Sequence, residues 1–286
     1  MKIAIYGSRR QDRHLDVLEA FLAGLEAAGH EVVMHPKLYH YLLGLAPMAL
    51  KCVRRVEENA AHTGADMAIS IGGDGTFLRT AEWVGGSGTP IAGVNTGHLG
   101  YLTATGIEGL PQLPAAFEAG ALVAEPRSLI EVKEPQLKTV WPYALNEVAL
   151  LKTETASMIS VHAAVDGHEL AEYRVDGLLV STPTGSTAYN LSVGGPIVQP
   201  CAPVWVVAPV APHSLSMRPL VLGDEAELTL VANSRAPHVR LSIDGRAVSL
   251  DSGTRITLRR APFVVNVLHP AGYHFAATLR DKLHWE

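Results

Sequence analysis

The first part of the chain alternates short apolar runs with amphipathic stretches. The apolar runs predict strands at Lys2 to Tyr6, Glu31 to Met34, Met67 to Ile71 and Ile91 to Val94. Helical spacing or polar composition predicts helices at Leu15 to Ala28, ending at Gly29, around Val53 to His62, and from Thr76 to about Val84. Strands that alternate with helices imply a parallel sheet covered on both faces.

From about Glu125 onward the pattern becomes short alternating runs, which are typical of antiparallel strands. These runs are Ser160 to Val165, Glu227 to Ala232, Val239 to Ile243, Arg255 to Leu258 and Val264 to Leu268. Hairpin turns are indicated by Asp166-Gly167, Asp244-Gly245 and Asp251-Ser-Gly253. We therefore expect an α/β domain over residues 1–122, a β-rich domain over 123–270, and a tail over 271–286 that returns to the first domain.

Composition narrows the class of protein. The chain has 286 residues, 48% hydrophobic and 18% charged, which fits two globular domains. Its net charge of −5 and the absence of a basic cluster argue against a nucleic-acid binder. Cys52 and Cys201 are unpatterned, which favours a reducing cytoplasm over a disulfide framework or a cysteine zinc site. No apolar run of about 20 residues occurs, so no membrane span is expected.

The apolar run Met67 to Ile71 ends in Gly72-Gly-Asp-Gly-Thr76, three glycines around one carboxylate. Glycines without a Cβ allow a sharp turn and a close approach to a ligand. The free N–H groups of the helix that follows favour an anion. This pattern predicts a phosphate site at Asp74; the alternative is an ordinary strand-to-helix turn with an N-terminal aspartate.

Two further segments carry polar chemistry inside apolar surroundings. In Asp176 to Pro196, a buried strand runs into a glycine-containing turn where Tyr189 can stack on a planar ring and several hydroxyls can bind phosphates, ribose or base edges. Those hydroxyls belong to Ser181, Thr182, Thr184, Ser186 and Thr187. Asn146 and Glu147 interrupt another apolar run and must be satisfied or face a ligand. The alternatives are a Ser/Thr-rich capping loop and a plain strand start.

Common nucleotide motifs are absent: there is no P-loop, no Gly-x-Gly-x-x-Gly at the first strand, and no protein-kinase lysine or His-Arg-Asp element. The chain instead resembles NAD kinases, through six blocks in the family's order. These are Gly72-Gly-Asp-Gly-Thr76, Gly93 to Thr103, Asn146-Glu147, Asp176 to Pro196, Pro212 to Pro219 and Ser242-Ile-Asp-Gly245.

This resemblance implies an enzyme that phosphorylates the 2′-hydroxyl of the adenosine ribose of NAD to form NADP. It implies ATP as donor, a divalent cation such as Mg²⁺ without dedicated protein ligands, and a homodimer or homotetramer. It also implies a Rossmann-like α/β domain of the phosphofructokinase and diacylglycerol-kinase type, followed by a β-rich, sandwich-like domain.

By the same resemblance, Asp74 is the catalytic carboxylate, and we expect it to position the hydroxyl and accept its hydrogen bond, without acting as a strong base. Gly73, Gly75 and Thr76 would line the phosphate turn, and Arg79 would face phosphates. Asn146 and Glu147 would hold adenine or ribose groups, and Asp176 would contact the dinucleotide. The adenine pocket would be framed by Thr187, Ala188, Tyr189, Asn190, Leu191 and Ser192, with Ala211 as a backbone contact.

Two positions carry arginine where other family members carry a different residue. Arg246 stands where many members have glutamine, so its charge would meet a phosphate. Arg174 stands where polyphosphate-using members tend to have glycine, which favours ATP as donor. For Arg79 and Arg174 the alternative is a solvated arginine.

Two other functions share some of these features. Lipid kinases that act on diacylglycerol or sphingoid bases carry a similar Gly-Gly-Asp-Gly-Thr signature, but they need an apolar cleft where this chain has the polar loop from Ser181 to Tyr189. A non-catalytic dinucleotide sensor would bind NAD without transfer, and Asp74 argues against it.

Overall fold

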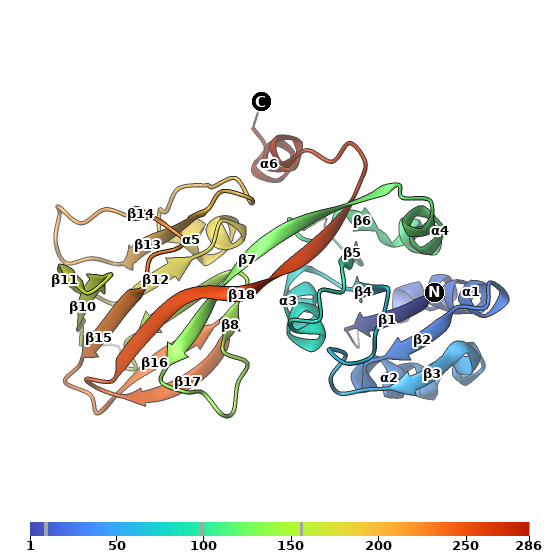
Figure 1. The fold of residues 1–286 in the computed structure, drawn as a ribbon, viewed down its shortest axis with the longest axis horizontal. Helices are drawn as coiled ribbons and strands as arrows, with labels where there is room; N and C mark the ends of the chain where they lie inside the picture. The colour runs from blue at the N-terminus through green and yellow to red at the C-terminus, as the bar shows by residue number, and fades with distance from the viewer. Residues whose placement is uncertain (9–10, 98–99, 155–156, 286) are drawn as a thin grey trace. The chain divides into compact units, whose positions relative to one another are not determined.

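The computed structural model describes residues 1–8, 11–97, 100–154 and 157–285, which form two compact units (Figure 1). Unit 1 comprises Met1–Pro126 and Val265–Glu286, and unit 2 comprises Arg127–Val264. Two long strands, β7 (Leu122–Glu134) and β18 (Arg255–Pro270), carry the chain from one unit into the other. The domain boundaries expected at 122/123 and 270/271 stay a prediction.

Unit 1 is built on a parallel sheet with the strand order β5-β4-β1-β2-β3. Its strands are β1 (Lys2–Gly7), β2 (Glu31–Met34), β3 (Val53–Val56), β4 (Met67–Ile71) and β5 (Ile91–Asn95). A two-residue strand, β6 (Thr105–Gly106), and the end of β18 at Val267 and Leu268 also pair with β5 in parallel. Every residue of β4 and β5 is buried, which requires cover on both faces of the sheet.

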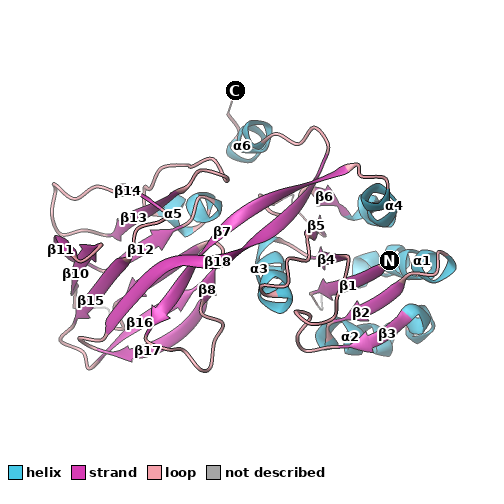
Figure 2. Ribbon diagram, in the orientation of Figure 1, coloured by secondary structure: helices cyan, strands magenta, loops and turns pink. Residues whose placement is uncertain are grey.

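Helices of unit 1 supply that cover, and Figure 2 shows them in cyan around the strands. The α-helices are α1 (Leu15–Ala27), α2 (Pro36–Leu45), α3 (Asp74–Val84), α4 (Leu113–Glu118) and α6 (Phe275–Leu283). The 3₁₀ turns are η1 (Asp12–His14), η2 (Pro47–Cys52) and η3 (Ile107–Gln112). Leu18, Phe21, Leu22 and Leu25 make the buried stripe of α1, as their spacing predicted.

The helix expected around Val53 to His62 is wrong. Val53–Val56 forms the edge strand β3, which pairs with β2 through Val32 and Met34. An edge strand tolerates the charged pair Arg54 and Arg55 because its outer side faces solvent, so a polar pattern there does not distinguish strand from helix.

The order of strands in unit 1 places a switch point between β1 and β4. The chain runs from β1 outward to β2 and β3, then returns to the other side of β1 to form β4 and β5. Ligands in open parallel sheets bind outside the carboxyl ends of the strands at such a point. Gly72 follows the carboxyl end of β4, so the topology favours a ligand at the glycine-rich turn.

Unit 2 consists of antiparallel strands, and Figure 2 shows it almost entirely in magenta. One sheet has the order β14-β13-β12-β9-β16-β17, and the other contains β11, β10, β15 and the first part of β18, with β7 and the short β8 attached. The strands of the first sheet are β9 (Glu147–Leu151), β12 (Gly177–Ser181), β13 (Val204–Val210), β14 (Leu220–Gly223), β16 (His238–Ile243) and β17 (Arg246–Asp251). The others are β8 (Tyr143–Ala144), β10 (Ile159–Val165), β11 (His168–Val175) and β15 (Leu228–Asn233), and two short helices, η4 (Thr184–Thr187) and α5 (Tyr189–Ser192), follow β12.

The core of unit 2 lies between these two sheets. Val161 and Leu230 from one sheet join Leu178, Trp205 and Leu241 from the other in a single buried cluster. This packing confirms the sandwich-like arrangement, and the parallel sheet of unit 1 confirms the α/β part of the expected fold class. Among the described residues, no helix is both long enough and apolar enough to cross a membrane.

Turn chemistry in unit 2 follows the sequence closely. Asp166-Gly167 and Asp244-Gly245 have positive φ at both residues, which is the backbone of a tight hairpin turn. The two runs expected at Arg255 to Leu258 and Val264 to Leu268 form one continuous strand, β18. Pro262 lies between the part of β18 that pairs with β15 and the part that pairs with β5. Its missing N–H therefore removes no hydrogen bond from either of these two pairings.

A glycine in β5 tests how closely the next loop packs on the sheet. A Cβ on Gly93 would collide with the Leu102 carbonyl oxygen and lie 2.8 Å from Thr103 Cα, so we expect Gly93→Ala to lower the free energy of unfolding by about 1–3 kcal/mol. Gly24 in α1 has no atom near such a Cβ, and Gly24→Ala should raise stability by about 0.5–1 kcal/mol. Urea denaturation of both variants measures this, and a Gly93→Ala protein as stable as Gly24→Ala would contradict the packing.

Candidate active site

The glycine-rich turn of unit 1 joins β4 to α3 through a backbone that only glycine tolerates. Gly72 has φ of 153°, and a Cβ on it would collide with the Thr76 side chain. α3 begins at Asp74, two residues earlier than expected, so this carboxylate lies in the first turn of the helix. The N–H groups of Thr76 and Phe77 donate to the Gly73 carbonyl, at 2.8 and 3.1 Å. Among the described residues, the N–H groups of Asp74 and Gly75 have no acceptor and remain for an anion.

Three donors from one loop hold the Asp74 carboxylate. The Tyr101 N–H donates to Oδ2 at 2.8 Å, and the Leu102 N–H and the Thr103 hydroxyl donate to Oδ1 at 3.1 and 3.0 Å. A carboxylate has about four acceptor positions, so roughly one stays open for a further donor. The arrangement stabilises negative charge on Asp74 and fixes its direction.

The same loop is braced from behind by buried polar groups. The Asn95 amide donates to the Thr103 hydroxyl at 2.9 Å, and the Gly100 N–H donates to it at 3.1 Å. Thr103 is fully buried, so these hydrogen bonds fix the hydroxyl that in turn donates to Asp74. His98 and Leu99, which belong to the block Gly93 to Thr103, lie outside the described residues.

Gly100 is a functional residue that sequence reasoning missed. A Cβ on Gly100 would collide with Asp74 Oδ1 and with the Thr103 hydroxyl. Its place in a Gly-containing block was visible, but its contact with a carboxylate 26 positions away was not.

Arg79 lies on α3 after the turn. Its side chain is about half exposed, and its Nη1 is 3.3 Å from Glu82 Oε2 on the same helix. An exposed ion pair of this kind contributes at most about 1 kcal/mol, so Arg79 is free to exchange Glu82 for an anionic ligand.

In unit 2, a second aspartate holds the segment that contains Asn146 and Glu147. Asp244 Oδ2 accepts the Leu145 N–H at 2.7 Å, and Oδ1 accepts the N–H groups of Asn146 and Glu147 at 2.9 and 3.0 Å. The described residues offer the Asn146 side-chain amide no hydrogen-bond partner. The backbone is thus fixed while this amide stays available.

The Glu147 carboxyl is strongly perturbed. Burial raises its pKa to about 7, with a further contribution from the Asp244 charge, and the Tyr189 N–H acts in the opposite direction. Burial likewise raises the pKa of Asp244. Glu147 Oε2 is buried with no hydrogen-bond partner in the described residues. A buried carboxyl that titrates near neutrality beside an open amide is typical of a binding site.

The hydroxyl-rich loop after β12 is mostly internal, so the interpretation of Ser181, Thr182 and Ser186 as ligand contacts is wrong. All three are fully buried. The Thr182 hydroxyl donates to the Leu145 carbonyl at 2.5 Å, and the Ser186 hydroxyl bonds both backbone groups of Val198. These hydroxyls replace backbone hydrogen bonds inside an irregular loop, which is the capping role left open by the sequence. Thr184 is also nearly buried and accepts a hydrogen bond from Arg127 Nη1 at 3.3 Å.

The following residues, Thr187 to Ser192, differ in exposure. Tyr189 is 36% exposed, while Thr187, Ala188 and Leu191 are half-buried and Ser192 is exposed. Asn190 is fully buried, and its amide donates to the Ser186 and Pro196 carbonyls at 3.2 and 3.0 Å. Asn190 therefore shapes the loop, whereas Tyr189 presents its ring.

Asp176 lies in a partly exposed cluster of charged side chains. Asp176 Oδ1 is 2.8 Å from Lys152 Nζ and 3.9 Å from His213 Nε2. Arg174 is 65% exposed and lies 3.8 Å from Glu172. Ala211 has φ of 47°, a left-handed backbone that directs its amide differently from an extended strand.

Arg246 is buried and interacts with its own unit. Its guanidinium donates to the Tyr143 carbonyl at 2.6 Å and lies 5.4 Å from the centroid of the Trp141 ring. These contacts favour a structural role, and a phosphate contact by Arg246 stays a prediction.

Comparisons with known proteins show which family the chain resembles. The ATP-NAD kinase N-terminal domain matches residues 6–121, and the ATP-NAD kinase C-terminal domain matches residues 145–269. An NAD kinase of Porphyromonas gingivalis is 42% identical over 287 residues, which cover 99% of this chain and 98% of the relative. One of Bacteroides fragilis is 39% identical over 287 residues, which cover 100% and 98%.

Two solved structures share the fold. The NAD kinase from Archaeoglobus fulgidus in complex with ATP has a TM-score of 0.74 at 27% identity, covering 99% of each chain. The yeast NADH kinase complexed with NADH has a TM-score of 0.86 at 22% identity, covering 100% of this chain and 88% of that one. The chain therefore belongs to the NAD kinase family of phosphotransferases.

Proposed function

We propose that this member of the NAD kinase family uses Asp74 to direct the 2′-hydroxyl of the adenosine ribose of NAD toward the terminal phosphoryl group of ATP. The observation that carries the proposal is the Asp74 carboxylate, held by three donors with about one acceptor position left for a substrate hydroxyl. The ribose oxygen forms a bond to the γ-phosphorus while the bond to the β-γ bridging oxygen breaks, giving ADP and NADP. The hydroxyl proton leaves along its hydrogen bond to Asp74.

Alignment and charge neutralisation supply most of the rate in phosphoryl transfer, so a strong base is not needed. The N–H groups of Asp74 and Gly75 and the positive end of α3 suit the developing charge on the phosphates. Gly73 and Thr76 complete this turn, and Arg79 lies on the same helix for a phosphate contact.

A divalent cation fits this turn chemically. Mg²⁺ usually keeps several waters and binds through substrate phosphates. Because the open position of Asp74 is assigned to the substrate hydroxyl, the donor's phosphates and water would provide most of the oxygen ligands. When bound, the cation would neutralise phosphate charge. Among the described residues, no group of three or more His, Cys, Asp or Glu side chains could hold a metal ion.

For the nucleoside, we propose that Asn146 and Glu147 contact adenine or ribose groups, with Tyr189 offering a ring face and Asp176 and Ala211 meeting the rest of the dinucleotide. The open Asn146 amide and the perturbed Glu147 carboxyl support this assignment. ATP, rather than polyphosphate, stays the expected donor.

We also expect a homodimer or homotetramer in a reducing cytoplasm. Leu215, 95% exposed, and Val221, 48% exposed, are large apolar side chains on unit 2 that an interface would cover. Cys52 is a buried thiol that forms no disulfide.

Replacing the carboxylate tests its role. Asp74→Asn should lower kcat for NADP formation by orders of magnitude, because an amide cannot accept the substrate hydroxyl while also satisfying the three donors. NAD affinity should change little. NADP is measured through a coupled dehydrogenase and NAD binding by calorimetry, with Asp16→Asn on the exposed start of α1 as the control. Loss of NAD binding in Asp74→Asn would make the residue structural.

Two glycines of the same loop form a matched pair. Gly100→Ala should reduce kcat at least about 100-fold, because the added methyl displaces Asp74 and a misplacement of about 1 Å costs that much. Among the described residues, a Cβ on Gly97 would meet only Asn95 Oδ1 at 3.8 Å, so Gly97→Ala should keep most activity. Similar rates for the two variants, measured by the same NADP assay, would contradict the proposed geometry.

Glu147 predicts a pH dependence of stability. Its pKa is about 7 in the folded protein and 4.5 in the reference state. Between these values the folded protein keeps a proton that the unfolded chain has lost, so the free energy of unfolding should fall as pH rises from 4.5 to about 7 and level off above. Denaturation curves across this range measure the effect in the protein without nucleotide.

The matched variants for this experiment are Glu147→Gln and Glu169→Gln, the second at an exposed position on β11. Glu147→Gln should flatten the pH dependence and Glu169→Gln should leave it unchanged. If ribose hydroxyls bind the carboxylate, NAD affinity of the unmodified protein should rise as pH passes about 7. A slope that survives in Glu147→Gln would assign it to another group.

A further inference from the structure

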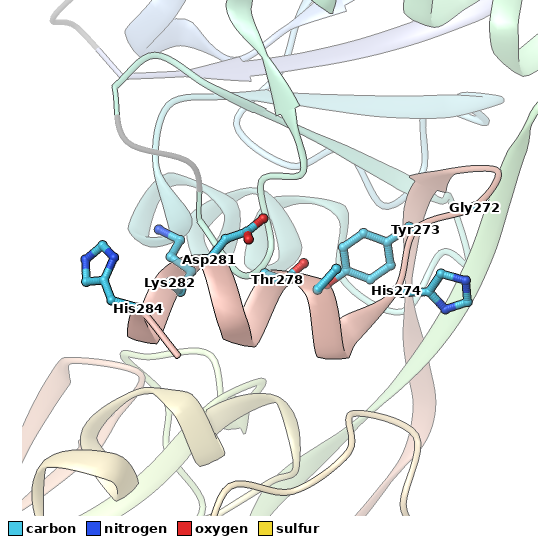
Figure 3. Close-up of a pocket in the computed structure, with 8 residues that line it drawn as sticks. Gly272, Tyr273, His274, Thr278, Asp281, Lys282 and His284 are labelled. Atoms are coloured by element: carbon cyan, nitrogen blue, oxygen red, sulfur yellow. The ribbon is translucent and has the colours of Figure 1, made fainter. Parts of the chain in front are cut away.

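A pocket of about 530 Å³ lies along α6 in unit 1, and the family comparison gives it no role. Figure 3 shows Tyr273, Thr278, Asp281 and Lys282 along the helix, with His274 and His284 at its two ends. Ligand pockets commonly have volumes of about 300–1,000 Å³, so this one holds more than a single ion.

The pocket is connected to Asp74 through one residue. Lys282 Nζ lies 5.7 Å from the centroid of the Tyr101 ring, and the Tyr101 N–H is one of the three donors to Asp74. Burial raises the pKa of the Tyr101 phenol, and the charges of Asp74 and Tyr273 raise it further. The Tyr101 side chain is therefore close enough to both the Asp74 carboxylate and the pocket-lining Tyr273 to feel their charge.

The charges of the lining favour an anion. Lys282 is half-buried, and within the described part of the chain no carboxylate forms an ion pair with it. Among the described residues, Asp281 is the one acidic residue in the lining, and its carboxylate is 68% exposed and 3.8 Å from Arg280 Nε. Solvent thus reduces the effect of Asp281 on the pocket, and the exposed pair with Arg280 adds little to this.

Neutral donors accompany the ammonium. The Tyr273 hydroxyl is buried without a hydrogen-bond partner in the described residues, although its ring stacks on His269 at 4.0 Å. Leaving a buried hydroxyl unpaired is unfavourable, and a ligand atom that accepts its hydrogen bond would remove that cost. The Thr278 hydroxyl, from the same helix, is a second donor to the lining.

We propose that the α6 pocket is a phosphate subsite in which Lys282 binds phosphate oxygens next to the position of transfer. The proposal rests on the proposed function only in placing that transfer at Asp74. The phosphate comes from one of two sources: the chain of phosphates of the donor, or the 2′-phosphate of the product dinucleotide. Lys282 acts there as a point charge that neutralises the bound phosphate.

Calorimetric titration of the full chain with tripolyphosphate tests the subsite without turnover. Lys282→Met keeps the apolar stem and removes the charge, so tripolyphosphate affinity should fall at least about tenfold, the effect of one charge-assisted hydrogen bond. Arg280→Met, two residues away on the same helix, removes an exposed charge and should change affinity less than about twofold. Circular dichroism of both variants confirms that α6 and the fold are retained.

Titrations with ATP, NADP and NAD then distinguish the sources. Weaker ATP binding with unchanged NADP binding assigns the pocket to the donor, whereas weaker NADP binding with unchanged NAD binding assigns it to the product's 2′-phosphate. Either result supports the subsite. Equal losses in Lys282→Met and Arg280→Met, or no loss of any phosphate ligand, would overturn it.

Failure of the proposed function gives a different pattern. If the protein binds tripolyphosphate through Lys282 but makes no NADP, the subsite proposal stands and the proposed transfer at Asp74 is wrong. If Lys282→Met makes NADP as well as the unmodified protein and binds every phosphate ligand with unchanged affinity, only the subsite proposal is wrong.

Discussion

A carboxylate that accepts three hydrogen bonds from one distant loop is the constraint on which the first unit's site depends. Asp74 opens α3, and its donors come from Tyr101, Leu102 and Thr103. Hydrogen bonds to a charged group contribute about 1.5–3 kcal/mol each, so the loop and the helix start are fixed together. The approach is possible because glycines stand at the three closest points: Gly72 under Thr76, Gly93 under Leu102, and Gly100 against the carboxylate itself. Gly72 lets the turn close on α3, whereas Gly93 and Gly100 remove side chains that would otherwise separate the loop from β5 and from Asp74.

Unit 2 contains a second aspartate that accepts three hydrogen bonds, in different surroundings. Asp244 also accepts three backbone N–H groups, but it is buried beside the Glu147 carboxyl. Two carboxyl groups in one low-dielectric site cannot both ionise easily, so burial and mutual repulsion keep a proton on the pair up to about pH 7. The described residues that bond Asp74 are instead two N–H groups and one hydroxyl, at the positive end of α3. Each carboxylate accepts three hydrogen bonds, and the two sites differ in the groups that surround them.

The sequence predicts the parts of this arrangement that are encoded locally. Apolar runs located β1, β2, β4 and β5 of the parallel sheet, and Asp-Gly pairs located the hairpin turns, because both depend on neighbours in the chain. The segment Val53 to His62 was assigned wrongly because an exposed edge strand and a polar helix have similar composition. The hydroxyls of Ser181, Thr182 and Ser186 were indistinguishable from ligand contacts until the structure placed them against the Leu145 and Val198 backbone. Pairings across 27 residues, such as Asp74 with Tyr101, and across 98, such as Asn146 with Asp244, have no local signature.

Fold and substrate choice reside in different parts of the chain. A parallel sheet with its switch point between β1 and β4 directs any anionic ligand to the turn after β4, whichever molecule carries the phosphate. That turn alone would serve a lipid kinase as well as a nucleotide kinase, since a phosphate has the same chemistry in both. Selection of a nucleoside requires groups that read hydroxyls and ring edges, and the described residues of unit 2 supply an unpaired amide at Asn146 and a perturbed carboxyl at Glu147. On the proposed assignment of Asn146 and Glu147 to the nucleoside, a lipid acceptor would leave these polar groups unsatisfied, and that cost would disfavour it.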